Sequence, residues 1–90
     1  MDFEMEPSRI RLADTQGQTI AEVFFPEEQD GIVNITHTFV DDSLRGQGVA
    51  GQLMEAVAMR LRREGKRARL TCSYAVRWFP AHPEFHDVLA

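Results

Sequence analysis

The stretch of residues 38–51 reads TFVDDSLRGQGVAG, and it marks the point where the local pattern of the chain changes. Before it, residues 32–40 are rich in β-branched side chains, which is typical of a strand. After it, apolar residues recur every four positions, at Val49, Leu53, Val57 and Leu61. This spacing predicts an amphipathic helix from Gly48 to about Arg63, so we expect a strand, a glycine-rich loop and a long helix in direct succession.

The rest of the chain extends this pattern on both sides. Residues 8–14 alternate apolar and charged side chains, and residues 19–25 are also typical of a strand. Together with residues 32–40 they predict an antiparallel meander of three strands. Pro26 ends the second strand, and residues 27–31 form a polar connector. After the long helix we expect a strand over residues 66–72, a helix over 73–79, and a last helix from Pro83. The predicted order βββ-α-β-α-α is a mixed α/β (α+β) fold with a mostly antiparallel sheet.

Composition restricts the classes of protein to which the chain can belong. Its 90 residues allow one domain, covering residues 1–90, and no apolar run approaches the ~20 residues that cross a bilayer. The acidic start differs from a signal peptide, so we expect a cytoplasmic protein that binds no membrane. The single cysteine, Cys72, excludes an internal disulfide and a cysteine-based zinc cluster, and we expect no metal.

Charge is distributed unevenly along the chain. The net charge is −4, which argues against nucleic acid as a partner. Most acidic residues lie at or before Asp42, whereas most basic residues lie at or after Arg45. An anionic ligand would therefore favour the second half of the chain.

The loop over residues 45–50 has the features of an anion site. The first backbone N–H groups of a helix have no intrahelical partner, and the helix dipole adds positive charge there. Gly46, Gly48 and Gly51 let a ligand approach the backbone closely because they have no Cβ. Arg45 adds a guanidinium suited to phosphate, and Gln47 adds an amide donor.

Three alternative kinds of loop also place glycines at the start of a helix. The plainest is a helix start that contains glycine and binds no ligand. A Walker A loop requires Gly-Lys-Ser/Thr after the second glycine, where this chain has Val49-Ala50-Gly51. A dinucleotide-binding loop requires a parallel βαβ unit, which the predicted meander does not provide.

The loop and its surroundings resemble the GNAT superfamily of acetyltransferases. That superfamily carries a Gln/Arg-x-x-Gly-x-Gly/Ala loop between a central strand and its main helix, and this chain has RGQGVA at residues 45–50. Within the superfamily the chain is similar to a subgroup of small proteins that share four ordered motifs. These motifs are HTFV at residues 37–40, LRGQG at 44–48, CSY at 72–74 and HPEF at 82–85.

The resemblance implies a cofactor and the residues that hold it. In the family the cofactor is acetyl-CoA or coenzyme A, and its diphosphate lies on the loop amides. The matching residues here are Arg45, Gly46, Gln47, Gly48, Val49 and Ala50. The strand before the loop diverges from its neighbour and pairs with the pantetheine amides, a role that falls on Thr38, Phe39 and Val40.

Cys72 is the candidate nucleophile for acyl transfer. It lies between a predicted strand and a predicted helix, where N-terminal amides would lower the pKa of a thiol. A thiolate there could accept the acetyl group and pass it to an amine. The alternative is a buried structural cysteine, because cysteine is among the most buried residue types.

Two further side chains have both a functional and a structural interpretation. His37 could act as a general base, but we expect it to share one strand face with Val33, Ile35 and Phe39, so it could equally be a core residue. Tyr74 could line the channel for the cofactor thiol, but Tyr74 and Trp78 lie four residues apart and could simply pack against the sheet.

Two functions therefore remain open from the sequence. One is an acetyl-CoA-dependent N-acetyltransferase acting on an unidentified amine of a small molecule or a protein. The other is a non-catalytic module that binds coenzyme A or an acyl thioester, or an interaction protein with an inactive site.

Overall fold

The computed structural model describes residues 2–90 and contains seven strands around one long helix. The N-terminal part forms a sheet in the order β1-β2-β3-β6, with all neighbours antiparallel. Its strands are β1 (Glu4–Met5), β2 (Arg9–Ala13), β3 (Thr19–Phe24) and β6 (His37–Val40). The predicted meander is this sheet, and β1 is an addition to it.

A second, smaller sheet has the order β4-β5-β7. Its strands are β4 (Glu27–Gln29), β5 (Ile32–Ile35) and β7 (Arg67–Leu70), and β5 pairs with β7 in parallel. The polar connector expected over residues 27–31 was wrong for the residues of β4. Their side chains are exposed, so their polarity reflects an edge strand rather than a loop.

The expected single strand over residues 32–40 is divided at Thr36. The Thr36 amide donates to the Phe24 carbonyl, while His37 is the register partner of Phe24, so two residues oppose one. This arrangement is a β-bulge, which bends a strand and changes the faces of the residues that follow. As a result β5 belongs to one sheet and β6 to the other, and no strand of residues 2–90 lies beside the edge of β6 away from β3.

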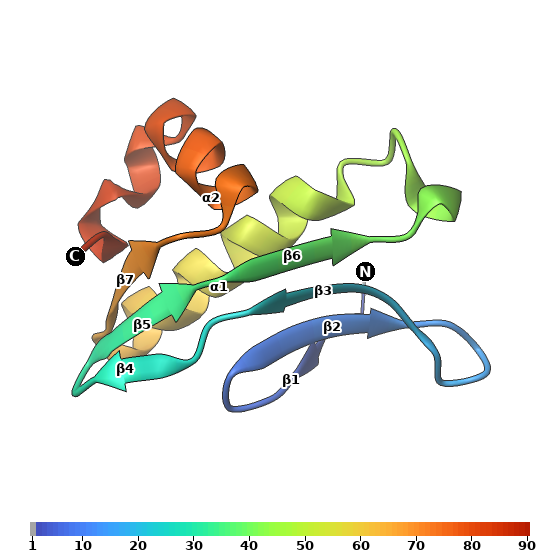
Figure 1. Cartoon of the computed structure of the whole chain (residues 1–90), viewed down its shortest axis with the longest axis horizontal. Helices are drawn as coiled ribbons and strands as arrows, with labels where there is room; N and C mark the ends of the chain where they lie inside the picture. Colours follow the sequence, from blue (N-terminus) through green and yellow to red (C-terminus); the bar gives the residue numbers. More distant parts are fainter. Residues whose placement is uncertain (1) are drawn as a thin grey trace.

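Helix α1 (Val49–Glu64) packs across the sheets with its apolar stripe (Figure 1). The buried residues of the helix are Val49, Leu53, Met54, Val57, Ala58 and Leu61. They share one hydrophobic cluster with residues from β2 to the C-terminal turns. The predicted helix, its start and its apolar face are therefore confirmed.

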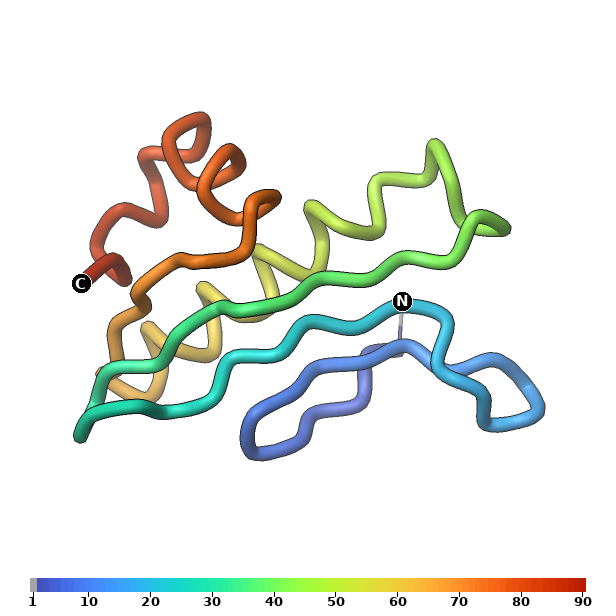
Figure 2. The backbone as a smooth tube through the Cα atoms, in the orientation of Figure 1, coloured from blue at the N-terminus to red at the C-terminus, as the bar shows by residue number. Residues whose placement is uncertain are grey.

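The chain beyond β7 turns away from β6 into α2 (Ser73–Trp78), as the tube in Figure 2 shows. Two 3₁₀ segments follow, over Phe79–Ala81 and Pro83–Val88. The last helix expected from Pro83 is thus a 3₁₀ helix, and its N-cap residue His82 makes no side-chain capping bond. The mixed α/β class and the mostly antiparallel sheet are confirmed.

A buried asparagine holds β7 against β5 close to the point where the sheets separate. Asn34 is 4% exposed, accepts a hydrogen bond from the Thr71 hydroxyl at 2.9 Å and donates one to Glu28 at 2.9 Å. The amides of Thr71 and Cys72 both donate to the Ile35 carbonyl. These bonds fix the position of Cys72 where β7 ends.

Candidate active site

The glycine-rich loop follows β6 through the 3₁₀ turn η1 (Asp42–Leu44) and ends at Gly48, the N-cap residue of α1. The Arg45 amide donates to the Asp42 carbonyl and the Gln47 amide to the Leu44 carbonyl, at 3.1 and 3.2 Å. Two of the amides that the sequence offered to a ligand are therefore bonded within the loop. Their bonds hold the turn and are not free for an anion.

The remaining loop amides are open. Within residues 2–90 no acceptor binds the amides of Gly46, Gly48, Val49, Ala50 or Gly51. Gly48 has a φ of 72°, in the left-handed region, and provides no side-chain cap. Residues 45–48 are exposed, so the unpartnered donors of Gly46 and Gly48 lie at the surface beside the positive end of the helix dipole. This is the arrangement that binds an anion at a helix start.

Arg45 lies at this loop but already has a partner. Its side chain is 80% exposed and forms an ion pair with Asp42 at 2.8 Å. Exposed pairs of this kind contribute little to stability, so the guanidinium can exchange Asp42 for another anion at small cost.

The strand that leads into the loop has an open edge. The Asp41 amide donates to the Ile20 carbonyl, and hydrogen bonds alternate along an antiparallel pair, so the backbone groups of Thr38 and Val40 point away from β3. The side chains of Thr38 and Val40 are half-buried. The expected cofactor-pairing segment Thr38-Phe39-Val40 thus presents the backbone of two of its residues on the free edge.

Cys72 lies beside this edge, at the start of α2. Its Sγ atom is 3.4 Å from the hydroxyl of Thr38, and the residue is 9% exposed. Burial raises the pKa of the thiol, but hydrogen bonds from Thr38 and from the amides of Ala75 and Tyr74 lower it by more. The net effect is a pKa below the ordinary value for cysteine. The structure therefore brings Cys72 and Thr38 together.

His37 does not join this group. Alternate residues of a strand point to opposite faces, and Thr38 faces Cys72, so His37 points away from it. The His37 ring is exposed and lies 5.8 Å from the Phe24 ring. The expectation that His37 shares a face with Val33 and Ile35 was wrong, because the bulge at Thr36 shifts the alternation. Its role as a general base stays a prediction.

Phe39 shares the outward face of β6 with His37 and is 39% exposed. It lies opposite Glu22 in the register of β3 and β6. Its side chain therefore contributes nothing to the face that carries Cys72, and its backbone groups point toward β3 rather than to the free edge.

Tyr74 and Trp78 face the first turn of α1. A Cβ atom placed on Gly51 would lie 3.8 Å from the Tyr74 hydroxyl and 3.4 Å from Nε1 of Trp78. Burial raises the pKa of Tyr74, so the phenol stays protonated. The sequence indicated Tyr74 as a possible site residue and Trp78 as a packing residue. Their spacing of four residues already predicted that both side chains lie on one face of the helix.

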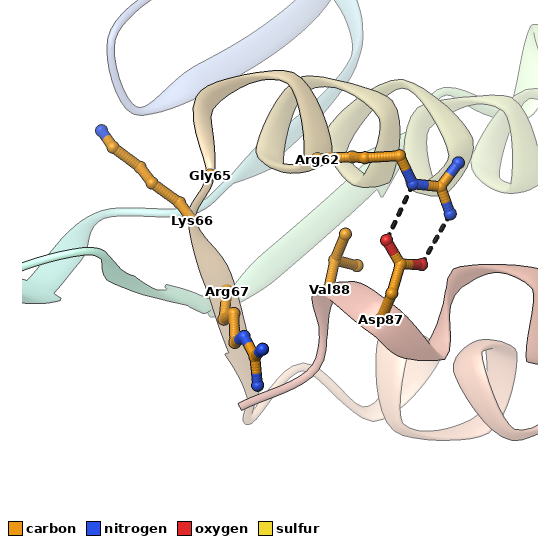
Figure 3. A pocket seen from close by; sticks show the side chains of 6 residues that line it. All are labelled: Arg62, Gly65, Lys66, Arg67, Asp87 and Val88. Atoms are coloured by element: carbon orange, nitrogen blue, oxygen red, sulfur yellow. Dashed lines mark hydrogen bonds and ion pairs between the residues drawn. The ribbon is translucent and has the colours of Figure 1, made fainter.

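A hollow in the surface lies elsewhere, at the opposite end of α1 (Figure 3). It has a volume of about 190 Å³, and its lining includes Arg62, which forms a two-bond ion pair with Asp87. Within residues 2–90 no group of three or more His, Cys, Asp or Glu side chains is arranged for a metal ion. None of the helices described is long and apolar enough to span a membrane.

Known structures share this architecture. A protein from Staphylococcus aureus, described as a proposed GCN5-like N-acetyltransferase, superposes with a TM-score of 0.82 at 26% identity, covering 99% of this chain and 87% of its own. A GNAT family N-acetyltransferase from Escherichia coli, solved in complex with CoA, gives a TM-score of 0.65 at 27% identity. That match covers 78% of this chain but 43% of the E. coli chain.

A third structure, a proposed acetyltransferase from Agrobacterium tumefaciens, is 18% identical and shows the shared fold, with a TM-score of 0.64 over 87% of this chain and 56% of its own. No curated protein matches the chain. The family model of the GCN5-related N-acetyl-transferases matches residues 9–88, which is nearly the whole sequence. The chain therefore belongs to the GCN5-related N-acetyltransferase family.

Proposed function

We propose that this protein binds acetyl-CoA across the first turn of α1 and the open edge of β6, and transfers the acetyl group to an amine. Two groups of unpartnered backbone atoms carry the proposal. One comprises the amides of Gly46 and of residues 48–51, and the other is the free edge of β6 at Thr38 and Val40. The E. coli family member solved with CoA supports the choice of ligand.

Each part of the cofactor has a matching feature in this arrangement. The diphosphate suits the N–H groups of Gly46, Gly48, Val49 and Ala50, with Arg45 released from Asp42 to reach it. The pantetheine amides suit the outward backbone groups of Thr38 and Val40, which can pair with them as a strand would. In this orientation the thioester extends toward Cys72 and Thr38.

Cys72 can accept the acetyl group within this arrangement. Its thiolate attacks the thioester carbonyl, a new C–S bond forms to Cys72, and the C–S bond to coenzyme A breaks, so the cofactor leaves as a thiolate. An amine then attacks the acetyl-cysteine, the nitrogen loses its proton to solvent, and the Cys72 thiolate is regenerated. The lowered pKa of Cys72 favours the first step because only the thiolate is nucleophilic.

A binding protein without turnover is the second candidate, and one observation favours it. Within residues 2–90 the pKa of Cys72 is set by burial and by neutral hydrogen-bond donors, and no charged side chain contributes. Among the described side chains the thiol is hydrogen bonded only to the Thr38 hydroxyl, which neither takes up nor supplies protons at ordinary pH.

Mass spectrometry of the intact protein after incubation with acetyl-CoA tests the role of Cys72. We expect a mass gain of one acetyl group in the wild type and none in Cys72→Ala. The matched control is Thr38→Val, which keeps the thiol but removes the hydroxyl beside it and should acquire the acetyl group more slowly.

The outcomes separate the candidates. An adduct that persists in Cys72→Ala removes Cys72 as the acceptor and leaves direct transfer to an amine. An increase in melting temperature with CoA, without an adduct and without acetylation of any amine tested, favours the binding protein. No increase at millimolar CoA contradicts both functions.

A further inference from the structure

The indole of Trp78 stands out among the aromatic side chains at the C-terminal end. Trp78 is 92% buried, since its exposed fraction is 8%. Its ring stacks on His82, with centroids 3.7 Å apart and planes at 11°, and it contacts the rings of Phe79 and Phe85. The ring is thus fixed in one orientation by neighbours on several sides.

The polar atom of this buried ring has no partner among residues 2–90, although its neighbours are satisfied. His82 Nδ1 is hydrogen bonded to the Trp78 carbonyl and His86 Nε2 to the Phe79 carbonyl, each at 2.8 Å. The indole Nε1–H can only donate, and no acceptor of the described chain receives it. Nε1 is not fully enclosed, so it keeps some contact with the surface.

The direction of the indole shows where such a ligand would lie. Nε1 lies 3.4 Å from the position that a Cβ of Gly51 would occupy, and the Tyr74 hydroxyl lies 3.8 Å from the same point. Gly51 belongs to the first turn of α1, where the amides of residues 49–51 also lack acceptors within residues 2–90. Two side-chain donors from α2 therefore lie beside the first turn of α1, and a side chain on residue 51 would touch both of them.

We propose that Trp78 Nε1–H, together with the Tyr74 hydroxyl, donates hydrogen bonds to an oxygen of coenzyme A at the first turn of α1. This inference rests on the proposed function, because it adds two side-chain donors to that cofactor site. Trp78 is then a binding residue for the cofactor, and Gly51 keeps the space that the cofactor oxygen occupies. A phosphate oxygen and a pantetheine carbonyl oxygen share the required chemistry, since both accept hydrogen bonds.

Trp78→Phe tests the inference by removing the N–H and keeping an aromatic ring. Calorimetric titration with CoA should show affinity weaker by roughly 3- to 10-fold for a carbonyl acceptor and by more than about 10-fold for a phosphate. ADP, which carries the diphosphate without the pantetheine arm, distinguishes the two sources. Weaker ADP binding in Trp78→Phe identifies the phosphate, whereas unchanged ADP binding identifies the pantetheine arm.

Gly51→Ala is the second variant, and it does not share the risk of loosening the aromatic cluster. Alanine favours a helix more than glycine does, so the melting temperature should stay the same or rise. The added methyl group occupies the space in front of Trp78 Nε1 and Tyr74, so CoA affinity should fall. Phe85→Leu is the matched control: it loosens the packing on the Trp78 ring but keeps the N–H, so CoA affinity should be retained.

Fluorescence gives an independent readout because Trp78 is the only tryptophan of the chain. Saturating CoA should change the emission of the wild type if it bonds to the indole. Wild-type binding of CoA with unchanged emission, and with unchanged affinity in both Trp78→Phe and Gly51→Ala, overturns this inference while the proposed function stands. A wild type that does not bind CoA at all removes the proposed function, and this inference with it.

Discussion

Both ends of α1 carry a glycine in the left-handed region, but the backbone groups are hydrogen bonded at the C-terminal end and, within residues 2–90, unpaired at the N-terminal end. At the C-terminal end Gly65 has a φ of 70°, its amide donates to the Arg62 carbonyl, and the Lys66 amide donates to the Leu61 carbonyl. These two bonds make a Schellman motif, which satisfies carbonyls of the last turn that have no partner within the helix. At the N-terminal end Gly48 has a φ of 72°, but no side chain caps the helix.

Side chains follow the same division. Arg62 and Arg63 stand in the last turn, where positive charge suits the negative end of the dipole, and Arg62 is further fixed by Asp87. The first turn has no acidic residue and no Ser, Thr, Asp or Asn cap, which are the usual means of satisfying a helix start. The contrast shows that the backbone groups of α1 are satisfied within the chain at its C-terminal end, whereas at its N-terminal end they are left for a ligand to bind.

Substituting the two glycines gives the largest expected effect. No atom of the described chain lies within 4 Å of a Cβ built on Gly48 or on Gly65, and both residues have positive φ. Gly48→Ala and Gly65→Ala should therefore lose similar stability, about 1 kcal/mol each, from backbone strain. Only the Gly48 variant should lose CoA affinity, by about 100-fold or more, because the methyl group displaces a phosphate from several charged hydrogen bonds.

Thermal melts and calorimetric titrations of the two variants measure both quantities side by side. Equal CoA affinity in Gly48→Ala and Gly65→Ala would contradict the comparison, since the two ends would then be equivalent toward the cofactor.

Arginine substitutions should give the next effect. Arg45→Ala is expected to weaken CoA binding by about 10- to 100-fold, the range for one charged hydrogen bond, whereas Arg63→Ala in the last turn should leave it unchanged. Asp42→Asn should strengthen binding slightly, because Arg45 no longer pairs with a carboxylate. Titrations at two salt concentrations check this, since the dependence on salt should decrease in Arg45→Ala alone.

The smallest expected effect concerns the start of α2, where the amides already donate hydrogen bonds to the Cys72 thiol. Burial raises the pKa of the Cys72 thiol, but the Thr38 hydroxyl and the amides of Ala75 and Tyr74 lower it by more. The rate of alkylation by iodoacetamide should rise with pH and level off at a lower pH than for the unfolded chain. Thr38→Val should move this midpoint upward; an unchanged midpoint would show that the hydroxyl does not stabilise the thiolate.

The sign of the linked stability follows from the same shift. A folded-state pKa below the unfolded value means that the thiolate favours folding, so the contribution is fully present above the unfolded-state pKa of the thiol. It is lost as the pH falls through the lowered pKa of the folded state.

Local patterns were sufficient for the parts of the fold that depend on neighbours in sequence. The four-residue spacing from Val49 to Leu61 specified the helix and its buried face, and Gly65 specified its end, because both depend on contacts within one or two turns. The loop with Gly46 and Gly48 was located for the same reason, since the free amides of a helix start are a local property.

The tertiary structure alone decided the features that depend on distant partners. The division of residues 32–40 at Thr36 depends on distant partners, because β7 pairs with residues 32–35 whereas Phe24 bonds residues 36 and 37, which no local pattern records. The outward direction of His37 follows from that bulge, and the position of Trp78 follows from the packing of α2 on Gly51. Side chains come together at a site through strand register and helix packing, which join residues far apart in sequence. The sequence by itself therefore determined the helix and the open amides at its start, and only the tertiary structure decided which side chains surround them.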